Sequence, residues 1–247
     1  MKTIFLDYRF AEAVLDDPRF EGAKGEIVSV LQEASVPLLD CTQLDARRGG
    51  VKRRERRALA GDTTKRYFYL PVDQKQLNRD LEAAFVVKGW ATKPPIVPPG
   101  RSGGPGTGLR GDFKKGRLHV EVQFGNMARW YTDVFKFQLS YSLDEIDAGV
   151  LVVPTQRFAN VIDENVAYFE RVQRELPWAK MSLTLPIWVI GVEPEDDSPI
   201  RQCYEQAARL FEGSQTAEPI ASISYGDRVA EIPASLPEED PAAPLAD

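Results

Sequence analysis

Residues 112–123 have the sequence Asp-Phe-Lys-Lys-Gly-Arg-Leu-His-Val-Glu-Val-Gln. Apolar and polar residues alternate strictly from Arg117 to Phe124, and a period of two predicts a strand with one buried face. The apolar side comprises Leu118, Val120, Val122 and Phe124, and the polar side Arg117, His119, Glu121 and Gln123. Lys115-Gly116 predicts a tight turn before this strand, so Asp112 is expected at the end of the preceding strand.

Such a hairpin can bring the Asp112 carboxylate close to the polar face that carries Glu121. Two carboxylates, with a main-chain carbonyl between Glu121 and Gln123, form a site made only of oxygen ligands. Mg²⁺ suits such a site, because it is a hard cation that takes further ligands from water and substrate phosphate. The alternative interpretation is that both acids lie on the solvated face of an amphipathic strand.

The spacing Asp112, Glu121, Gln123 within Glu-Val-Gln-Phe-Gly resembles the active-site signature of the BglII/BstYI-like type II restriction endonucleases. These enzymes belong to the PD-(D/E)XK nuclease superfamily, and in their branch a glutamine replaces the usual lysine. The resemblance covers about residues 1–195, although the N-terminal helix region and the last fifty residues match weakly or not at all. Further similar segments are residues 69–72, 77–81, 88–90, 147–154 and 168–170.

The resemblance implies Mg²⁺-dependent hydrolysis of double-stranded DNA at a short palindromic site. Asp112, Glu121 and the Val122 carbonyl would hold the metal, and Gln123 would orient the attacking water. Lys93 falls near another active-site position of related enzymes, and its role stays open. A palindromic site cut on both strands implies a homodimer. The family also implies a cognate DNA methyltransferase that protects the host.

The overall composition is that of an ordinary globular protein, with 43% hydrophobic and 28% charged residues and a net charge of −6. No apolar run approaches the roughly 20 residues that span a bilayer. Neither a secretory signal nor a disulfide framework is evident, so the two cysteines, Cys41 and Cys203, predict a cytoplasmic protein, bacterial or archaeal by the resemblance. The single histidine excludes histidine-rich metal sites and leaves little room for a Ser-His-Asp triad.

Basic residues are concentrated in one segment, about residues 45–66, of an otherwise acidic chain. We interpret this segment as a flexible arm whose Arg53, Arg54 and Arg57 contact DNA phosphates and make binding salt-dependent. The alternative is a solvated loop. Residues 92–111 are dense in proline and glycine and predict a long loop, which could act as a flap over a ligand. They do not form a phosphate-binding loop, because the Lys-Ser/Thr ending is absent.

The remaining periodicities predict an α/β fold of the restriction-endonuclease type, a mixed β-sheet flanked by helices, within one domain of residues 1–230. Residues 1–35 are expected to be mostly helical, and a helix capped by Asn126 should run to about Ser142, buried against the sheet. The other expected strands are 67–72, 148–153, 182–192 and 220–225. The other expected helices are 76–87, 164–176 and 201–211. Residues 231–247 are expected to form a disordered acidic tail.

Residues 155–165 are expected to connect the strand at 148–153 to the next helix. In the restriction enzymes that the chain resembles, this region reads base edges. Gln156, Arg157, Asn160 and Asn165 have suitable side chains for that role. The alternative is a polar connecting loop. Arg129 and Lys136, seven residues apart on one helix face, are expected to be ordinary surface charges.

Two other functional classes stay open on the sequence alone. One is a repair-type or structure-selective PD-(D/E)XK nuclease, which would cut with little sequence dependence. The other is a non-catalytic DNA-binding module whose acidic cluster is only a solvated strand face. Such a module would bind DNA equally well with and without Mg²⁺.

Overall fold

A computed structural model describes residues 1–39, 51–54, 66–100, 108–163 and 165–212. A six-stranded mixed sheet forms its centre, in the order β1-β8-β7-β6-β5-β4. The strands are β1 (Lys2–Tyr8), β4 (Ala91–Thr92), β5 (Phe113–Lys115), β6 (Leu118–Val122), β7 (Ala148–Pro154) and β8 (Ile187–Glu193). Strands β6, β7 and β8 are parallel, and β1, β5 and β4 join them through antiparallel pairs.

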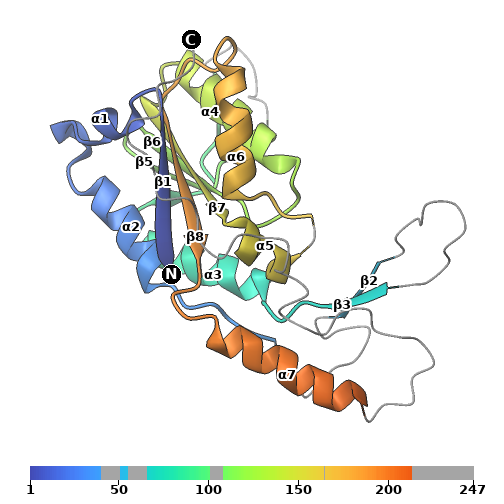
Figure 1. Cartoon of the computed structure of the whole chain (residues 1–247). Helices are drawn as coiled ribbons and strands as arrows, with labels where there is room; N and C mark the ends of the chain where they lie inside the picture. The colour runs from blue at the N-terminus through green and yellow to red at the C-terminus, as the bar shows by residue number, and fades with distance from the viewer. Residues whose placement is uncertain (40–50, 55–65, 101–107, 164, 213–247) are drawn as a thin grey trace, which may run out of the picture.

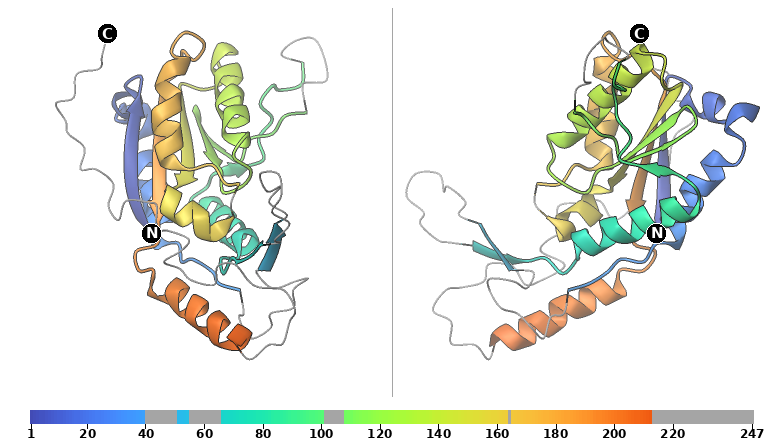
Figure 2. Two further views of the ribbon diagram at one scale, coloured as in Figure 1. Left: turned by 45° about the vertical axis from the view of Figure 1, so that its right-hand side comes forward. Right: turned by 180° about the vertical axis from the view of Figure 1, so that it is seen from behind.

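Helices cover both faces of the sheet, as Figures 1 and 2 show. The helices are α1 (Ala11–Leu15), α2 (Ala23–Glu33), α3 (Gln74–Val87), α4 (Arg129–Ser142), α5 (Gln156–Ile162), α6 (Phe169–Glu175) and α7 (Ser198–Glu212), with 3₁₀ turns η1 (Pro18–Phe20) and η3 (Leu176–Ala179). Helices α4 and α6 lie side by side on one face, while α2 and α3 lie on the other.

The side chains of β7 alternate between two hydrophobic cores. Val150 and Val152 pack into the core shared with α2, α3 and α5, whereas Leu151 and Val153 pack into the core shared with α4 and α6. Every residue of β7 is buried, as expected for a central parallel strand covered on both faces. The expected continuous apolar strand at 148–153 is therefore confirmed.

The strongest periodic patterns gave the right elements. The helix expected at 76–87 is α3, whose start is capped by the Asp73 side chain. The helix expected at 201–211 lies within α7, and the strand expected at 182–192 contains most of β8. The expected mixed sheet flanked by helices is the observed fold.

Three local expectations were wrong. Residues Lys2–Tyr8 form β1 rather than helix, because they pair along their whole length with β8. Residues 156–162 form α5 rather than a loop, with the Thr155 hydroxyl accepting a hydrogen bond from Phe158 N at 3.3 Å. The N-cap residue of α4 is Ala128. The Asn126 side chain, two residues before this N-cap, instead accepts a hydrogen bond from the Ala128 amide.

The basic arm is described only in part. Strands β2 (Val51–Arg54) and β3 (Arg66–Tyr69) pair antiparallel, so its base is a two-stranded ribbon rather than a fully flexible segment (Figure 1). The rest of the arm, the centre of the loop at 92–111, the strand expected at 220–225 and the tail at 231–247 lie outside the described residues. At the start of that loop, Ile96 and Val97 are buried.

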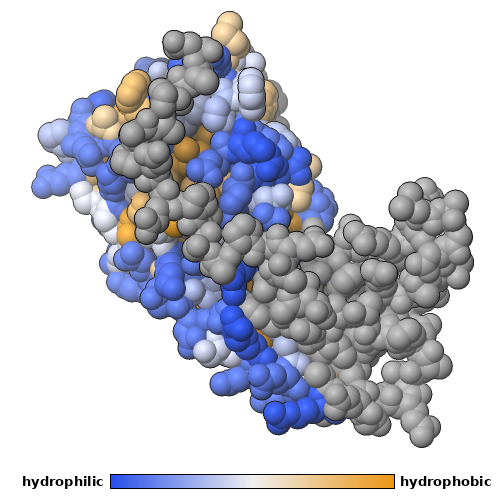
Figure 3. All heavy atoms as spheres, viewed as in Figure 1, coloured by the Kyte–Doolittle hydropathy of each residue, from blue (hydrophilic) through white to orange (hydrophobic). Residues whose placement is uncertain are grey.

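Among the residues that the structure describes, no helix is long and apolar enough to cross a membrane. The described part of the surface seen in Figure 3 is mainly hydrophilic, with apolar residues in small separate patches.

Candidate active site

The β5–β6 hairpin brings the two carboxylates of the motif into one site. Its turn contains Gly116 at φ 56°, a left-handed conformation that glycine adopts at little cost. Asp112 immediately precedes β5 instead of ending it, and its Oδ2 accepts a hydrogen bond from Val122 N at 2.9 Å. The N–H and C=O of a strand residue point to the same side, so the Val122 carbonyl also faces the side of β6 on which Asp112 lies.

The polar side of β6 does not face solvent. The exposed fraction of Glu121 and of His119 is 1%, and Gln123 is also buried. Glu121 pairs in register with Leu151 of β7, and the side of the sheet that carries Leu151 packs against α4. The interpretation of the acidic cluster as a solvated strand face is therefore wrong.

Helix α4 adds two charged residues to the site. Lys136 Nζ donates to Glu121 Oε2 at 3.0 Å and to Asp133 Oδ1 at 2.8 Å. Asp133 Oδ2 accepts from Gln123 Nε2 at 2.7 Å, and Gln123 Oε1 accepts from Gly125 N at 2.9 Å. Lys136 is thus not an ordinary surface charge, and its side chain is only 14% exposed.

The sequence itself contains a signal for Asp133 and Lys136. Trp130, Val134 and Phe137 form the buried arc of α4. At about 100° per residue Asp133 falls at the margin of that arc, about 40° from Phe137. A carboxylate placed among core positions indicates a buried charge that requires a partner, and Lys136 lies one turn away.

Burial determines the protonation of the site. Burial, and then repulsion from Glu121, raises the pKa of Asp112 to about 7. Burial, and then the Asp133 carboxylate, raises the pKa of Glu121 to about 8. The pKa of Lys136 is also raised: burial alone would lower it, but Glu121 and Asp133 together outweigh that effect. Near neutral pH the carboxyl groups of Asp112 and Glu121 therefore hold protons, and a bound cation can replace these protons.

The chain's single histidine lies against the same carboxyl group. His119 Nε2 is 3.1 Å from Glu121 Oε1, and burial, followed by the nearby charge of Lys136, lowers the pKa of His119 to about 4. The imidazole is therefore neutral at physiological pH. The backbone of Gly111 approaches the ring so closely that a Cβ at that position would overlap the imidazole.

The donor set fits a hard divalent cation that keeps water or phosphate ligands. Within the described part of the chain, the buried Glu121 Oε1 accepts no hydrogen bond of good geometry, and Asp112 and the Val122 carbonyl lie at the same end of β6. No cluster of three or more His, Cys, Asp or Glu side chains forms a closed cage among these residues. Mg²⁺ is commonly held by only one or two carboxylates, so two acids and a carbonyl are adequate.

The side chain of Lys93 points to another acid. Its Nζ lies 3.3 Å from Glu82 Oε1 and is largely exposed, whereas its backbone N–H donates to the Asp112 carbonyl at 2.9 Å. Lys93 has φ 50°. The main chain of Lys93 thus contacts the motif.

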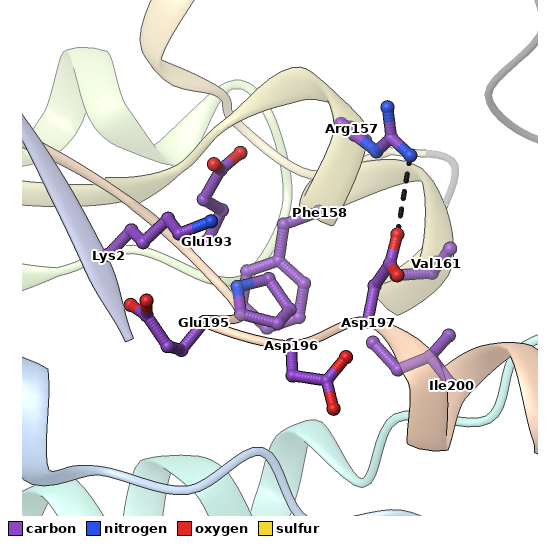
Figure 4. A pocket seen from close by; sticks show the side chains of 10 residues that line it. Lys2, Arg157, Phe158, Val161, Glu193, Glu195, Asp196, Asp197 and Ile200 are labelled. Atoms are coloured by element: carbon purple, nitrogen blue, oxygen red, sulfur yellow. Dashed lines mark hydrogen bonds and ion pairs between the residues drawn. The ribbon is translucent and has the colours of Figure 1, made fainter. Parts of the chain in front are cut away.

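The residues expected to read bases lie on or next to α5. Gln156 begins the helix, and its backbone N–H donates to Glu170 Oε2 at 2.8 Å. Arg157 lines a cavity of about 330 Å³ together with four acids, and its Nη2 is 3.3 Å from Asp197 Oδ2 (Figure 4). Asn160 is half-buried and Asn165 is exposed. Of the arm residues, Arg53 and Arg54 lie in β2, and Arg57 is outside the described residues.

Solved structures of a restriction endonuclease have a similar fold. No curated protein matches the chain. Among solved structures, the crystal structure of restriction endonuclease BglII in complex with a DNA 16-mer has 20% sequence identity and a TM-score of 0.55, covering 79% of this chain and 78% of that one. The crystal structure of free BglII has 18% identity and a TM-score of 0.52, covering 80% and 82%. These two likenesses support the fold.

The family model described as restriction endonuclease BglII/BglIII matches residues 3–192. This range spans most of the 247-residue chain, and it includes the β5–β6 hairpin, α4 and nearly all of β1 and β8. The chain therefore belongs to the BglII/BglIII family of restriction endonucleases and is a site-specific deoxyribonuclease.

Proposed function

We propose that the protein is a homodimeric type II restriction endonuclease that hydrolyses both strands of DNA at a short palindromic site and depends on Mg²⁺. One observation carries the catalytic part of this proposal. Two carboxyl groups, from Asp112 and Glu121, converge beside the C-terminal end of β6, and the buried Glu121 Oε1 there accepts no hydrogen bond of good geometry among the described residues, although His119 Nε2 lies 3.1 Å away.

Asp112, Glu121 and the Val122 carbonyl would hold the ion. When bound, Mg²⁺ polarises the scissile phosphate and lowers the pKa of a water molecule. Gln123 keeps one amide N–H and one oxygen lone pair beyond its bonds to Asp133 and Gly125. It can therefore still orient the attacking water, although its amide cannot accept the proton.

Double-stranded DNA would be bound by two groups of residues. Arg53, Arg54 and Arg57 of the basic arm would contact phosphates, which position the duplex without reading sequence. The side chains around α5 would read base edges in the major groove. These four are Gln156, Arg157, Asn160 and Asn165. The ion pair between Arg157 and Asp197 would have to open, or reorient, for Arg157 to reach a base.

The basic arm gives a salt-dependence prediction. Arg53→Ala combined with Arg54→Ala should reduce the slope of log K against log salt concentration by about 2, because each neutralised phosphate contributes roughly 0.9. Fluorescence anisotropy with a labelled duplex in Ca²⁺ measures the slope. The matched variant Arg53→Lys with Arg54→Lys keeps both charges and should leave it unchanged. An unaltered slope in the alanine variant would show that the arm does not contact phosphates.

A homodimer is the natural partner for a palindrome, because each subunit then cuts one strand. Helix α4 supports this part of the proposal. Tyr131 is 46% and Phe135 is 58% exposed on its outer side, and Trp178 and Met181 beyond α6 are also exposed. Large exposed apolar side chains on neighbouring helices commonly mark a protein contact. Sedimentation velocity measures the oligomeric state directly.

A cognate methyltransferase and a bacterial or archaeal cytoplasm complete the proposal. A restriction enzyme needs its host sites protected, and the methyltransferase is expected to recognise the same sequence.

The decisive experiment is digestion of a long, fully sequenced, unmethylated DNA, followed by sequencing of the fragment ends. Wild type in Mg²⁺ should give discrete fragments that share one short palindrome, while wild type in EDTA and Glu121→Ala in Mg²⁺ should give none. A smear would indicate a nuclease with little sequence dependence. Intact DNA with wild type in Mg²⁺, although the protein binds DNA, would refute the catalytic roles of Asp112, Glu121 and Gln123.

A further inference from the structure

Three hydrogen bonds link four side chains at the end of β6 and on α4 into one chain. Glu121 lies in β6, Gln123 follows the last residue of that strand, and Asp133 and Lys136 lie one turn apart on α4. The chain runs from Gln123 to Asp133 at 2.7 Å, from Asp133 to Lys136 at 2.8 Å and from Lys136 to Glu121 at 3.0 Å. Helix α4 therefore fixes both functional side chains of the strand.

Lys136 fixes one carboxylate oxygen of Glu121 and leaves the other. Its ammonium group donates to Oε2, while Oε1 has no hydrogen-bond partner in the described part of the structure. A buried charge is retained only when it is paired and hydrogen-bonded, and Lys136 meets both conditions through Glu121 and Asp133. The Glu121 carboxyl group is thus held in one orientation, with Oε2 bound to Lys136 and Oε1 facing the neutral His119 ring at 3.1 Å and the side on which Asp112 lies.

We propose that Lys136 is a positioning residue of the cleavage site, which orients the Glu121 carboxylate for the divalent ion and is itself held by Asp133. This inference rests on the proposed function. Lys136 acts through Glu121, so it need not touch DNA. Outer partners of metal-binding carboxylates commonly contribute a factor of 10 to 100 in metal affinity or activity.

A purely structural salt bridge would have a different effect. It would change the stability of the fold and leave metal affinity unaltered in any variant that still folds. The measurement therefore has to report metal binding as well as cleavage. Ca²⁺ serves as a probe, because it takes the same oxygen ligands as Mg²⁺, and its binding raises the temperature of unfolding of the folded protein.

The test compares Lys136→Met, Lys136→Gln and Lys136→Arg with wild type. The control is Lys114→Met. Lys114 lies in β5 and is also partly buried, and its Nζ is 3.5 Å from Glu145 Oε2. Thermal unfolding over a Ca²⁺ series gives the apparent metal affinity. Single-turnover cleavage at saturating DNA over a Mg²⁺ series gives the rate and its half-saturating metal concentration.

We expect Lys136→Met to bind Ca²⁺ at least about 10-fold more weakly and to cleave at least about 10-fold more slowly, with DNA affinity in Ca²⁺-free buffer within about threefold of wild type. Lys136→Arg keeps the charge and its donors and should recover part of both losses, and Lys114→Met should match wild type. If Lys136→Met fails to fold, Lys136→Gln, which is uncharged and shorter, carries the test.

A folded Lys136→Met or Lys136→Gln protein with wild-type Ca²⁺ affinity and wild-type Mg²⁺ dependence would overturn the inference and leave the proposed function standing. A wild-type protein with neither a Ca²⁺ shift nor Mg²⁺-dependent cleavage would overturn both. The two failures are therefore distinguishable.

Discussion

Replacing Glu121 with glutamine should stabilise the protein in EDTA, and the gain should be larger at about pH 8 than at about pH 5. Glu121 is buried, and its pKa is raised from the ordinary value of 4.5 to about 8. Over this range the folded protein keeps a proton that the unfolded chain has lost. The free energy of unfolding of the wild type therefore falls as pH rises through this window.

The magnitude follows from that shift. Between about pH 5 and about pH 8 the free energy of unfolding of the wild type should fall by on the order of 3 kcal/mol because of Glu121, since each pKa unit corresponds to about 1.36 kcal/mol. Glutamine has the same shape and does not titrate, so this loss is absent in Glu121→Gln. Glutamine also changes the hydrogen bond that Lys136 donates to Glu121. That cost is nearly the same at both pH values, because Glu121 keeps its proton over most of this window and Lys136 therefore faces an uncharged group in both proteins.

Urea unfolding in EDTA gives the free energy of unfolding of wild type and Glu121→Gln at each pH. The effect is the gap between the two proteins at about pH 8 minus the gap at about pH 5. Glu21→Gln, an exposed glutamate beside the 3₁₀ turn η1, is the matched control and should show no comparable pH-dependent gap. The reasoning is refuted if the gap between Glu121→Gln and wild type is equal at both pH values or widens toward low pH.

Two further substitutions test the packing around the site. Gly111→Ala places a methyl group in the space of the buried His119 ring. We therefore expect a loss of about 1–3 kcal/mol in the free energy of unfolding, and slower cleavage. The control is Gly25→Ala in α2, where a Cβ meets nothing within 4 Å, and this variant should be neutral or slightly stabilising. Thr155→Ala removes the cap of α5 and should lower the free energy of unfolding in urea by about 1 kcal/mol. Thr155→Ser keeps the hydroxyl that accepts from Phe158 N and should lower it much less. Equal losses in the two Thr155 variants would contradict the capping role.

Local patterns were sufficient to predict the central hairpin. The alternation in β6, the turn at Gly116 and the spacing of Asp112 and Glu121 all depend on residues close together in the chain. The same holds for α3, which has a strong helical period, and for β7, which is a continuous apolar run. The interactions that form these elements are short-range, or, in β7, result from burial on both faces.

The first strand could not be predicted in the same way. β1 pairs with β8, about 185 residues later in the chain, and its three consecutive apolar residues, Ile4, Phe5 and Leu6, match neither a strict alternation nor a helical period. Only the exposed edge of β8 makes this segment a strand. The seven-residue α5 was missed for a related reason, because its buried residues fit a helix only when the Thr155 cap is recognised.

The charged part of the site depends on tertiary packing. Whether Lys136 reaches solvent or Glu121 is decided by how α4 lies across the sheet, and this orientation follows from the apolar residues Trp130, Val134 and Phe137. The sequence contained a usable sign in Asp133, which lies beside Phe137 at the margin of these core positions. It could not reveal that Asp133 links Gln123 of the motif to Lys136.

The register between β6 and β7 explains why this site lowers the stability of the fold. Glu121 lies beside Leu151 on the face that α4 covers, so the sheet changes from apolar to charged between two adjacent strands. Burying carboxyl groups raises their pKa values, and that shift measures how much the folded state disfavours their charge. A divalent ion that binds only the folded protein reverses this penalty by mass action. The same carboxyl groups that destabilise the protein in EDTA should therefore make its stability depend on metal, more strongly as pH rises toward about 8.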